Sequence, residues 1–300
     1  MSDTKIFDIA GGTASEIIPQ TIQLEKELQI VFEKNLETIL AVRLLASEFS
    51  TTHGGRMDTL GIDEDNCPVI IEYKRNSSEN VINQGLFYLD WLMDHKAEFE
   101  LLVRDRFGKK TADEIAWGVP RLICVAKGFS KYDVHAVKQI NRNIELVRFE
   151  KFENEILLIE LLTANSTTSA KTSSNLNGNS STYKTVTQYL EQSDDQLKSL
   201  FGQIRDALLS LGDDIQEKTL KNYFAFKRLR NFACVEVKPN EKKILVYLKV
   251  DLEKSEFVDG FSRDVQHVGH FGTGHLELTL RSEEDLEKAK DFFQLSYDNS

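Results

Sequence analysis

Apolar positions recur with two different periods along the first half of the chain. Between Thr21 and Leu40 they repeat every three to four residues, which predicts an amphipathic helix. Helical spacing returns over residues 79–106 and 131–141. Strand-like runs lie between and after these helices, at residues 43–49, 56–62, 69–74, 121–126, 145–149 and 155–161. This order predicts an α/β (α+β) domain, with a mixed central sheet flanked by helices.

A segment of low complexity divides the chain. Residues 163–182 hold fifteen Ser, Thr or Asn in twenty positions, too little apolar surface to offset the entropy of ordering. We therefore expect a linker at 163–182 between a domain at 1–162 and a smaller one at 183–300. In the smaller domain, helical patterns at 183–191, 195–211 and 283–293 surround strand-like runs at 232–237, 244–250 and 275–280, which predicts an α+β fold.

Composition narrows the classes of function. No stretch of the 300 residues approaches the ~20 apolar residues of a membrane span, and the start of the chain lacks the pattern of a secretory signal. Three widely spaced cysteines disfavour a disulfide scaffold, so we expect a soluble cytoplasmic protein with no membrane contact. The net charge of −11 disfavours non-specific binding to nucleic acid, although residues 216–250 carry nine Lys/Arg against three Glu.

Two acids and a lysine are predicted to meet on one hairpin. If the loop between the second and third strands is centred on Asp65, then Asp58 lies opposite Glu72, and opposed carboxylates repel unless a cation lies between them. Lys74 follows Glu72 by two positions and therefore points to the same face. An ammonium there can activate a water and stabilise charge on a phosphate.

An acid two residues before a lysine occurs elsewhere in the chain and is weak evidence by itself. The residues around Glu72 and Lys74 make the prediction of a site here more specific. Glu72 and Lys74 follow a continuous apolar strand, with Asp58 on the strand before them. Gln84 and Tyr88 lie four residues apart on the next helix, hence on one helical face. For the acid–lysine pair alone, a surface salt bridge is the simpler interpretation; for the five residues together, a metal site is favoured.

The segments GRMDTLGID (55–63), VIIEYKR (69–75) and QGLFY (84–88) resemble the PD-(D/E)XK nuclease superfamily, in the branch of the NucS (EndoMS) and RecB-type nucleases. The resemblance covers about the first 162 residues and implies Mg²⁺-dependent phosphodiester hydrolysis. It implies that Asp58 and Glu72 are metal ligands, that Lys74 is catalytic and that the carbonyl of Tyr73 completes the metal shell. Met57 stands where many members of the superfamily have proline.

The resemblance further implies that Gln84 and Tyr88 position the substrate or a metal-bound water. It also places a glutamate of the first helix at the metal. On the helical projection, Glu25 lies at the margin of the apolar stripe, so it is our first choice; Glu27 is the second, ahead of Glu33. A solvated helix surface remains an equally simple role for each.

Cations in both domains are candidates for nucleic-acid contact. Arg43 and Arg56 belong to the strands beside the acid pair, where an ordinary charge at a sheet edge is as reasonable. Lys227, Arg228 and Arg230 lie in a run that mixes aromatic residues with cations, a pattern suited to stacking on bases and neutralising phosphates. Core aromatics with a solvated basic face explain that run equally well.

Together these features predict a nuclease that uses Mg²⁺ or Mn²⁺ and acts on nucleic acid, expected to be DNA. The second domain loosely resembles an uncharacterised domain found beside nuclease modules, and would bind nucleic acid or a partner. Two alternatives stay open: a module that recognises nucleic acid or protein without cleavage, and an interaction module in which the five residues form a structural polar cluster. A homodimer is compatible with the sequence.

Overall fold

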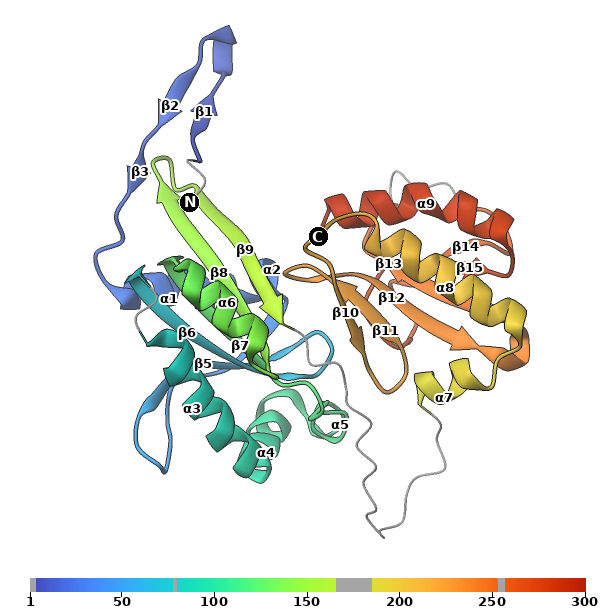
Figure 1. Cartoon of the computed structure of the whole chain (residues 1–300), viewed down its shortest axis with the longest axis horizontal. Coiled ribbons are helices and arrows are strands. Elements are labelled where there is room, and N and C mark those ends of the chain that lie inside the picture. The colour runs from blue at the N-terminus through green and yellow to red at the C-terminus, as the bar shows by residue number, and fades with distance from the viewer. Residues whose placement is uncertain (1–3, 78–79, 166–184, 253–256) are drawn as a thin grey trace.

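The computed structural model describes residues 4–77, 80–165, 185–252 and 257–300 (Figure 1). They form two bodies, each with its own sheet and core. Most of the linker expected at 163–182 lies outside the described residues. Its first three positions, Thr163 to Asn165, instead extend the last strand of the first body.

The first body is built on a mixed sheet, as predicted, with the strand order β3–β8–β7–β6–β5–β4 and with β9 also paired to β8. β4, β5 and β6 are antiparallel to one another, whereas β6, β7 and β8 run parallel. The strands are β3 (Pro19–Gln20), β4 (Val42–Ser50), β5 (Arg56–Asp63), β6 (Pro68–Ser77), β7 (Arg121–Gly128), β8 (Asn143–Phe152) and β9 (Leu157–Asn165).

Helices cover both faces of this sheet. In the core on one face, Leu28 and Phe32 pack against Val69 and Ile71 of the sheet. In the core on the other face, Leu89 packs with side chains from the helices that follow it in the sequence. The helices are α1 (Glu25–Lys34), α2 (Leu36–Leu40), α3 (Val81–Asp94), α4 (Lys96–Phe107), α5 (Lys109–Asp113) and α6 (Lys131–Gln139).

Two helices predicted as continuous are each broken once. The first is interrupted at Asn35, with φ −123°, and the second at His95, with φ −115°. In both cases the side chain of the interrupting residue reaches the carbonyl one turn earlier, Asn35 Nδ2 to Val31 O and His95 Nδ1 to Trp91 O, each at 2.8 Å. Such local side-chain bonds compete with the regular helical backbone, and the apolar periodicity does not reveal them.

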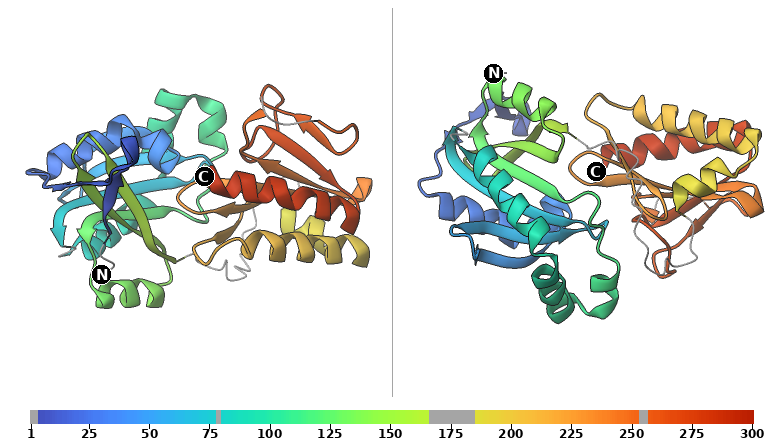
Figure 2. Two further views of the ribbon diagram at one scale, coloured as in Figure 1. Left: turned by 90° about the horizontal axis from the view of Figure 1, so that it is seen from above. Right: turned by 60° about the horizontal axis from the view of Figure 1, so that its bottom comes forward.

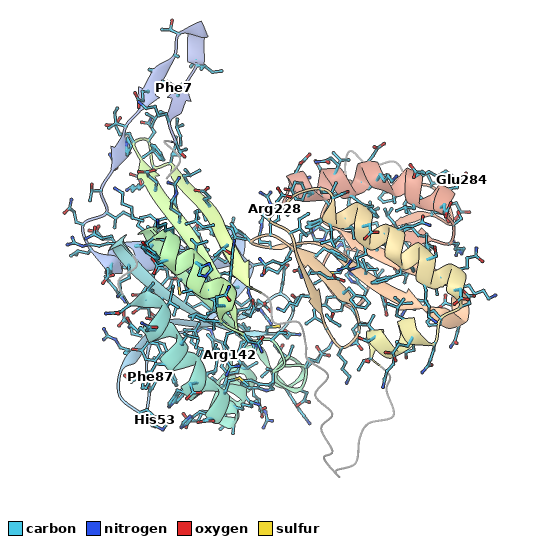
Figure 3. All side chains as sticks on the ribbon, viewed as in Figure 1. Phe7, His53, Phe87, Arg142, Arg228 and Glu284 are labelled. Carbon is cyan, nitrogen blue, oxygen red and sulfur yellow. The ribbon has the colours of Figure 1, made fainter. Side chains whose placement is uncertain are left out.

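An N-terminal arm, not expected from the sequence, extends away from the first body (Figure 1). It consists of β1 (Ile6–Asp8) and β2 (Ser15–Ile17), which pair antiparallel around a short 3₁₀ turn at Ala10–Gly12. Phe7 lies on the arm and is 49% exposed (Figure 3).

The second body is an antiparallel sheet with helices on one face, which agrees with the predicted α+β class. Figure 2 shows α8 and α9 together on that face. The strand order is β10–β11–β12–β13–β15–β14. The elements are α7 (Val186–Glu191), α8 (Asp195–Leu209), β10 (Gln216–Thr219), β11 (Phe224–Lys227), β12 (Asn231–Lys238), β13 (Lys243–Leu248), β14 (Ser262–Asp264), β15 (Leu276–Leu280) and α9 (Glu283–Asp298). No helix in the described part of the chain is long and apolar enough to cross a membrane.

Candidate metal centre

The hairpin of β5 and β6 places Asp58 and Glu72 side by side. Its register pairs Thr59 with Ile71, so the next positions along the two strands are Asp58 and Glu72. Each carboxylate accepts a hydrogen bond from the opposite strand: Glu72 Oε1 from Asp58 N at 3.2 Å, and Asp58 Oδ2 from Tyr73 N at 3.0 Å. The two side chains are therefore adjacent, as the centring of the loop predicts; their role as ligands stays a prediction.

Glu72 lies on the sheet face that α3 covers. Side chains alternate between faces along a strand, and Leu60 and Ile70 belong to the core cluster on the α3 side. Glu72 lies two positions from Ile70, hence on the same face, whereas on β5 Met57 belongs to the same cluster as Leu60, so the alternation is interrupted beside Asp58. Lys74, two positions further along β6, continues that face at the end of the strand. Asp58 is tied to Glu72 by the two hydrogen bonds across the hairpin, and Lys74 reaches Glu25 of α1 at the end of the strand.

Burial dominates the electrostatics of the pair. Glu72 is 0% exposed, and burial, followed by the charge of Asp58, raises the pKa of Glu72 to about 8. Burial also raises the pKa of Asp58, although the backbone N–H of Tyr73 and the charge of Lys74 oppose the rise. Among the residues that the structure describes, Glu72 Oε2 has no hydrogen-bond partner. Two crowded carboxylates with an oxygen left unsatisfied fit a divalent cation, which would neutralise both.

Glu25, the first choice on α1, lies at the end of β6 rather than against the two acids. Its Oε2 is 3.4 Å from Lys74 Nζ and accepts from Arg75 N at 3.3 Å. Glu27, the second choice, accepts from the backbone N–H of Gln23 at 3.2 Å. Glu25 is therefore the better placed of the two, and in this structure it positions the lysine.

Gln84 and Tyr88 are linked to the start of β5 by hydrogen bonds. Gln84 Nε2 donates to the Tyr88 hydroxyl at 3.4 Å, and that hydroxyl accepts from Arg56 N at 3.0 Å, two residues before Asp58. Gly55 permits the approach, because a Cβ at this position would lie 2.8 Å from the Tyr88 hydroxyl. Tyr88 thus holds the start of the strand that carries Asp58.

Gln29, a buried side chain beside the pair, was not predicted from the sequence. Its Nε2 donates to the carbonyl of Asp58 at 2.7 Å and to Glu33 Oε1 at 2.9 Å. Gln29 is 3% exposed and lies one turn after Glu25 on α1. A polar residue next to the apolar stripe, on the side already chosen for Glu25, is the signal that could have identified it.

The arginines proposed for nucleic-acid contact separate into two places. Arg56 is exposed and lies two residues before Asp58. Arg43 lies opposite Ile62, near the other end of the hairpin, and its guanidinium is 4.5 Å from the centroid of the Phe107 ring. Only Arg56 therefore stays beside the acid pair.

The three cations proposed in the second body are engaged within the protein. Lys227 is 3% exposed, with Nζ 3.3 Å from Glu145 Oε1 of the first body, so the expectation of a solvated basic face is wrong at this position. Arg228 is half-buried in an ion pair inside the second body. Arg230 donates to the carbonyl of Thr38 in the first body at 3.0 Å. These cations face acids and carbonyls of the same chain.

The ligand set available to a cation is small. In the described ranges, no group of three or more His, Cys, Asp or Glu side chains is arranged to hold a metal ion. Two carboxylates, Asp58 and Glu72, are adjacent, and the Tyr73 side chain packs against Phe32 in the opposite core, which leaves only its backbone for a ligand. Two carboxylates with a carbonyl and waters form a shell that Mg²⁺ accepts.

Comparison with known proteins found a family model that matches the second body and a relative that matches most of the chain. A family model described as a domain of unknown function (DUF5655) matches residues 186–300. A protein of Haemophilus influenzae, described as uncharacterized, is 29% identical over 293 residues, which cover 94% of this chain and 96% of that protein.

Two solved structures match part of the chain. One is a repair endonuclease from Pyrococcus abyssi, with a TM-score of 0.28 and 18% identity over 43% of this chain and 49% of that one. The other is an EndoMS–dsDNA complex, with a TM-score of 0.26 and 20% identity over 43% of this chain and 47% of that one. The match therefore spans about half the length of each solved chain.

Proposed function

We propose that the first body hydrolyses phosphodiester bonds with the help of Mg²⁺ or Mn²⁺, and that its substrate is DNA. The observation that carries this proposal is the fully buried Glu72, with an unsatisfied oxygen, beside the carboxylate of Asp58. These two side chains and the carbonyl of Tyr73 would hold the cation. A bound cation would activate a water and neutralise charge on the phosphate.

The surrounding residues have separate tasks in this proposal. Lys74, which Glu25 holds at the end of β6, would orient the attacking water and donate to a phosphate oxygen. Arg56 and Arg75 are exposed on the two strands that carry the acids and would contact the DNA backbone. Tyr88 would keep β5 in register through its bond to Arg56 N.

The proposal is tested by incubating the protein with Mn²⁺ and a panel of labelled DNA and RNA structures, with Mn²⁺ affinity measured separately by calorimetry. We expect Asp58→Asn and Glu72→Gln to abolish both Mn²⁺ binding and cleavage. Lys74→Met should retain Mn²⁺ binding but lower the cleavage rate by about 10²- to 10⁴-fold, because it removes a proton-handling group and no ligand.

Glu150→Gln is the matched control, since Glu150 is a half-buried acid on β8, away from the pair. It should bind Mn²⁺ and cleave like the wild type. If the wild type neither binds Mn²⁺ nor cleaves any substrate of the panel, the proposal is wrong.

Recognition of nucleic acid without hydrolysis is the second candidate. The small number of metal ligands favours this candidate, because among the described residues no third acidic side chain joins Asp58 and Glu72 to hold a cation. This candidate expects the same panel to show binding to DNA with no cleavage, and expects Glu72→Gln to leave that binding unchanged.

A further inference from the structure

The basic segment 216–250, which the proposed function does not use, meets an acidic turn of the first body. Asp63, Glu64 and Asp65 are consecutive at the tip of the β5–β6 hairpin. All three accept hydrogen bonds from the second body. The contact therefore brings together the most basic part of one body and an acidic tip of the other.

Each acid of the turn has its own donors. Asp65 Oδ1 accepts from the Tyr223 hydroxyl and from Asn231 Nδ2, both at 2.7 Å. Glu64 Oε1 accepts from Asn231 N at 2.6 Å, and Glu64 Oε2 from Lys249 Nζ at 2.5 Å. The neighbouring side chains of Glu64 and Asp65 thus accept hydrogen bonds from β12, from the end of β13 and from the loop before β11.

The deepest part of the contact is a network of buried charges. Lys218 Nζ lies 3.3 Å from Asp63 Oδ2, and Lys227 Nζ lies 3.3 Å from Glu145 Oε1. Arg121 of the first body donates to both acids, at 3.0 Å to Asp63 and at 2.7 Å to Glu145. Burying these groups is costly unless each has an opposite charge, and Lys218 and Lys227 supply two of the opposite charges from the second body.

The turn is held in shape by its own bonds. Asp63 Oδ1 accepts from Asp65 N at 3.0 Å and from Cys67 N at 2.8 Å, both within the turn. An apolar cluster surrounds the contact, in which Cys67 packs with Tyr223 and Cys234. A preformed turn loses little conformational entropy when it docks, so this surface can bind it as a ligand.

We propose that residues 186–300 form a binding module for an acidic β-turn, and that its ligand in this chain is the turn at 63–67. Recognition would depend on the donors described above and not on the covalent connection between the two bodies. This inference is independent of nuclease activity, because none of its donors belongs to the candidate metal centre.

The test starts from the folded full-length chain with a specific protease site placed between residues 166 and 184. After cleavage, we expect the two halves to elute together in size-exclusion chromatography at micromolar concentration. Lys218→Met should weaken the association about 100-fold or more, because it leaves Asp63 buried without that partner. Lys221→Met is the matched control, an exposed lysine three residues away, and should leave the association unchanged.

A charge exchange at the edge of the contact provides a second test, because Glu64 and Lys249 are less deeply buried and tolerate replacement better. Glu64→Lys and Lys249→Glu should each weaken the association about tenfold, and the double variant should recover part of the loss, because the ion pair returns while the backbone N–H of Asn231 still lacks its acceptor. Circular dichroism before cleavage confirms that each variant is folded. Separation of the wild-type halves at micromolar concentration, equal affinity of the Lys218→Met and Lys221→Met halves, or no recovery in the double variant would each overturn the proposal.

Discussion

Replacing Glu145 with glutamine tests the buried charges between the two bodies. Glu145 is 0% exposed, and Arg121 donates to its two oxygens at 2.7 and 2.8 Å. Burial by itself would raise the pKa of Glu145, but the charges of Arg121 and Lys227 outweigh burial and lower that pKa to about 2. The carboxylate is therefore held charged in the interior of the protein.

The size of the effect follows from this shift. A pKa of 4.5 in the unfolded chain and about 2 in the folded protein corresponds to about 3 kcal/mol of stability at pH 7. Because the folded pKa is the lower one, this contribution is present above the unfolded pKa and is lost as the pH falls through the folded pKa. Glutamine keeps the shape without the charge, so Glu145→Gln should lower the free energy of unfolding by about 3 kcal/mol at pH 7 and by about half of that at pH 3.

The assay is urea unfolding at several pH values, followed by the fluorescence of Trp91 and Trp117, which both lie in the first body. Glu150→Gln serves as the control on the same strand and should change the free energy of unfolding by less than about 0.5 kcal/mol. A loss in Glu145→Gln that is equal at pH 7 and pH 3 would show that altered packing, and not the charge, is the cause, and would refute the reasoning.

Three further changes test the surroundings of the acid pair. Gly85→Ala places a Cβ 2.4 Å from Leu122 Cδ1 and should lower the free energy of unfolding by about 1–3 kcal/mol in urea; an unchanged value would mean that the helix shifts without cost. Tyr88→Phe removes the acceptor of the Arg56 N–H and should cost about 1–2 kcal/mol in the same assay, whereas a neutral result would mean that water replaces the hydroxyl. Glu25→Gln should lower the cleavage rate but leave Mn²⁺ affinity in calorimetry unchanged, because Glu25 holds Lys74; weaker Mn²⁺ binding would show that Glu25 is a ligand.

The hairpin could be predicted because the residues that determine its register lie close together in the sequence. The apolar run that ends at Ile71 identifies a buried strand, and all of Val69, Ile70 and Ile71 are indeed 0% exposed. The loop composition then fixes the centre of the turn, and a centred turn fixes which residues lie opposite each other. For these reasons the adjacency of Asp58 and Glu72 follows from residues less than twenty positions apart.

The position of the basic segment could not be predicted, because its partners are distant in the sequence. Lys227 has the surroundings of a solvated cation in its own segment, but its partner Glu145 lies 82 residues earlier on β8. A local excess of charge shows that a counter-charge is needed and does not show where it is. Nucleic acid and an acidic surface of the same chain satisfy that need equally well, and here the structure pairs Lys218 and Lys227 with the latter.

The hairpin is fixed at both ends, and this matters for the acid pair. A slip of β5 by one residue against β6 would turn Asp58 to the opposite face of the sheet, away from Glu72. Tyr88 opposes such a slip at the start of β5, through its bond to Arg56 N. The second body opposes the slip at the turn, through its hydrogen bonds to Asp63, Glu64 and Asp65. The turn lies about 17 Å from Asp58 along the strand. The second body therefore supports the register of the pair from the far end of the hairpin.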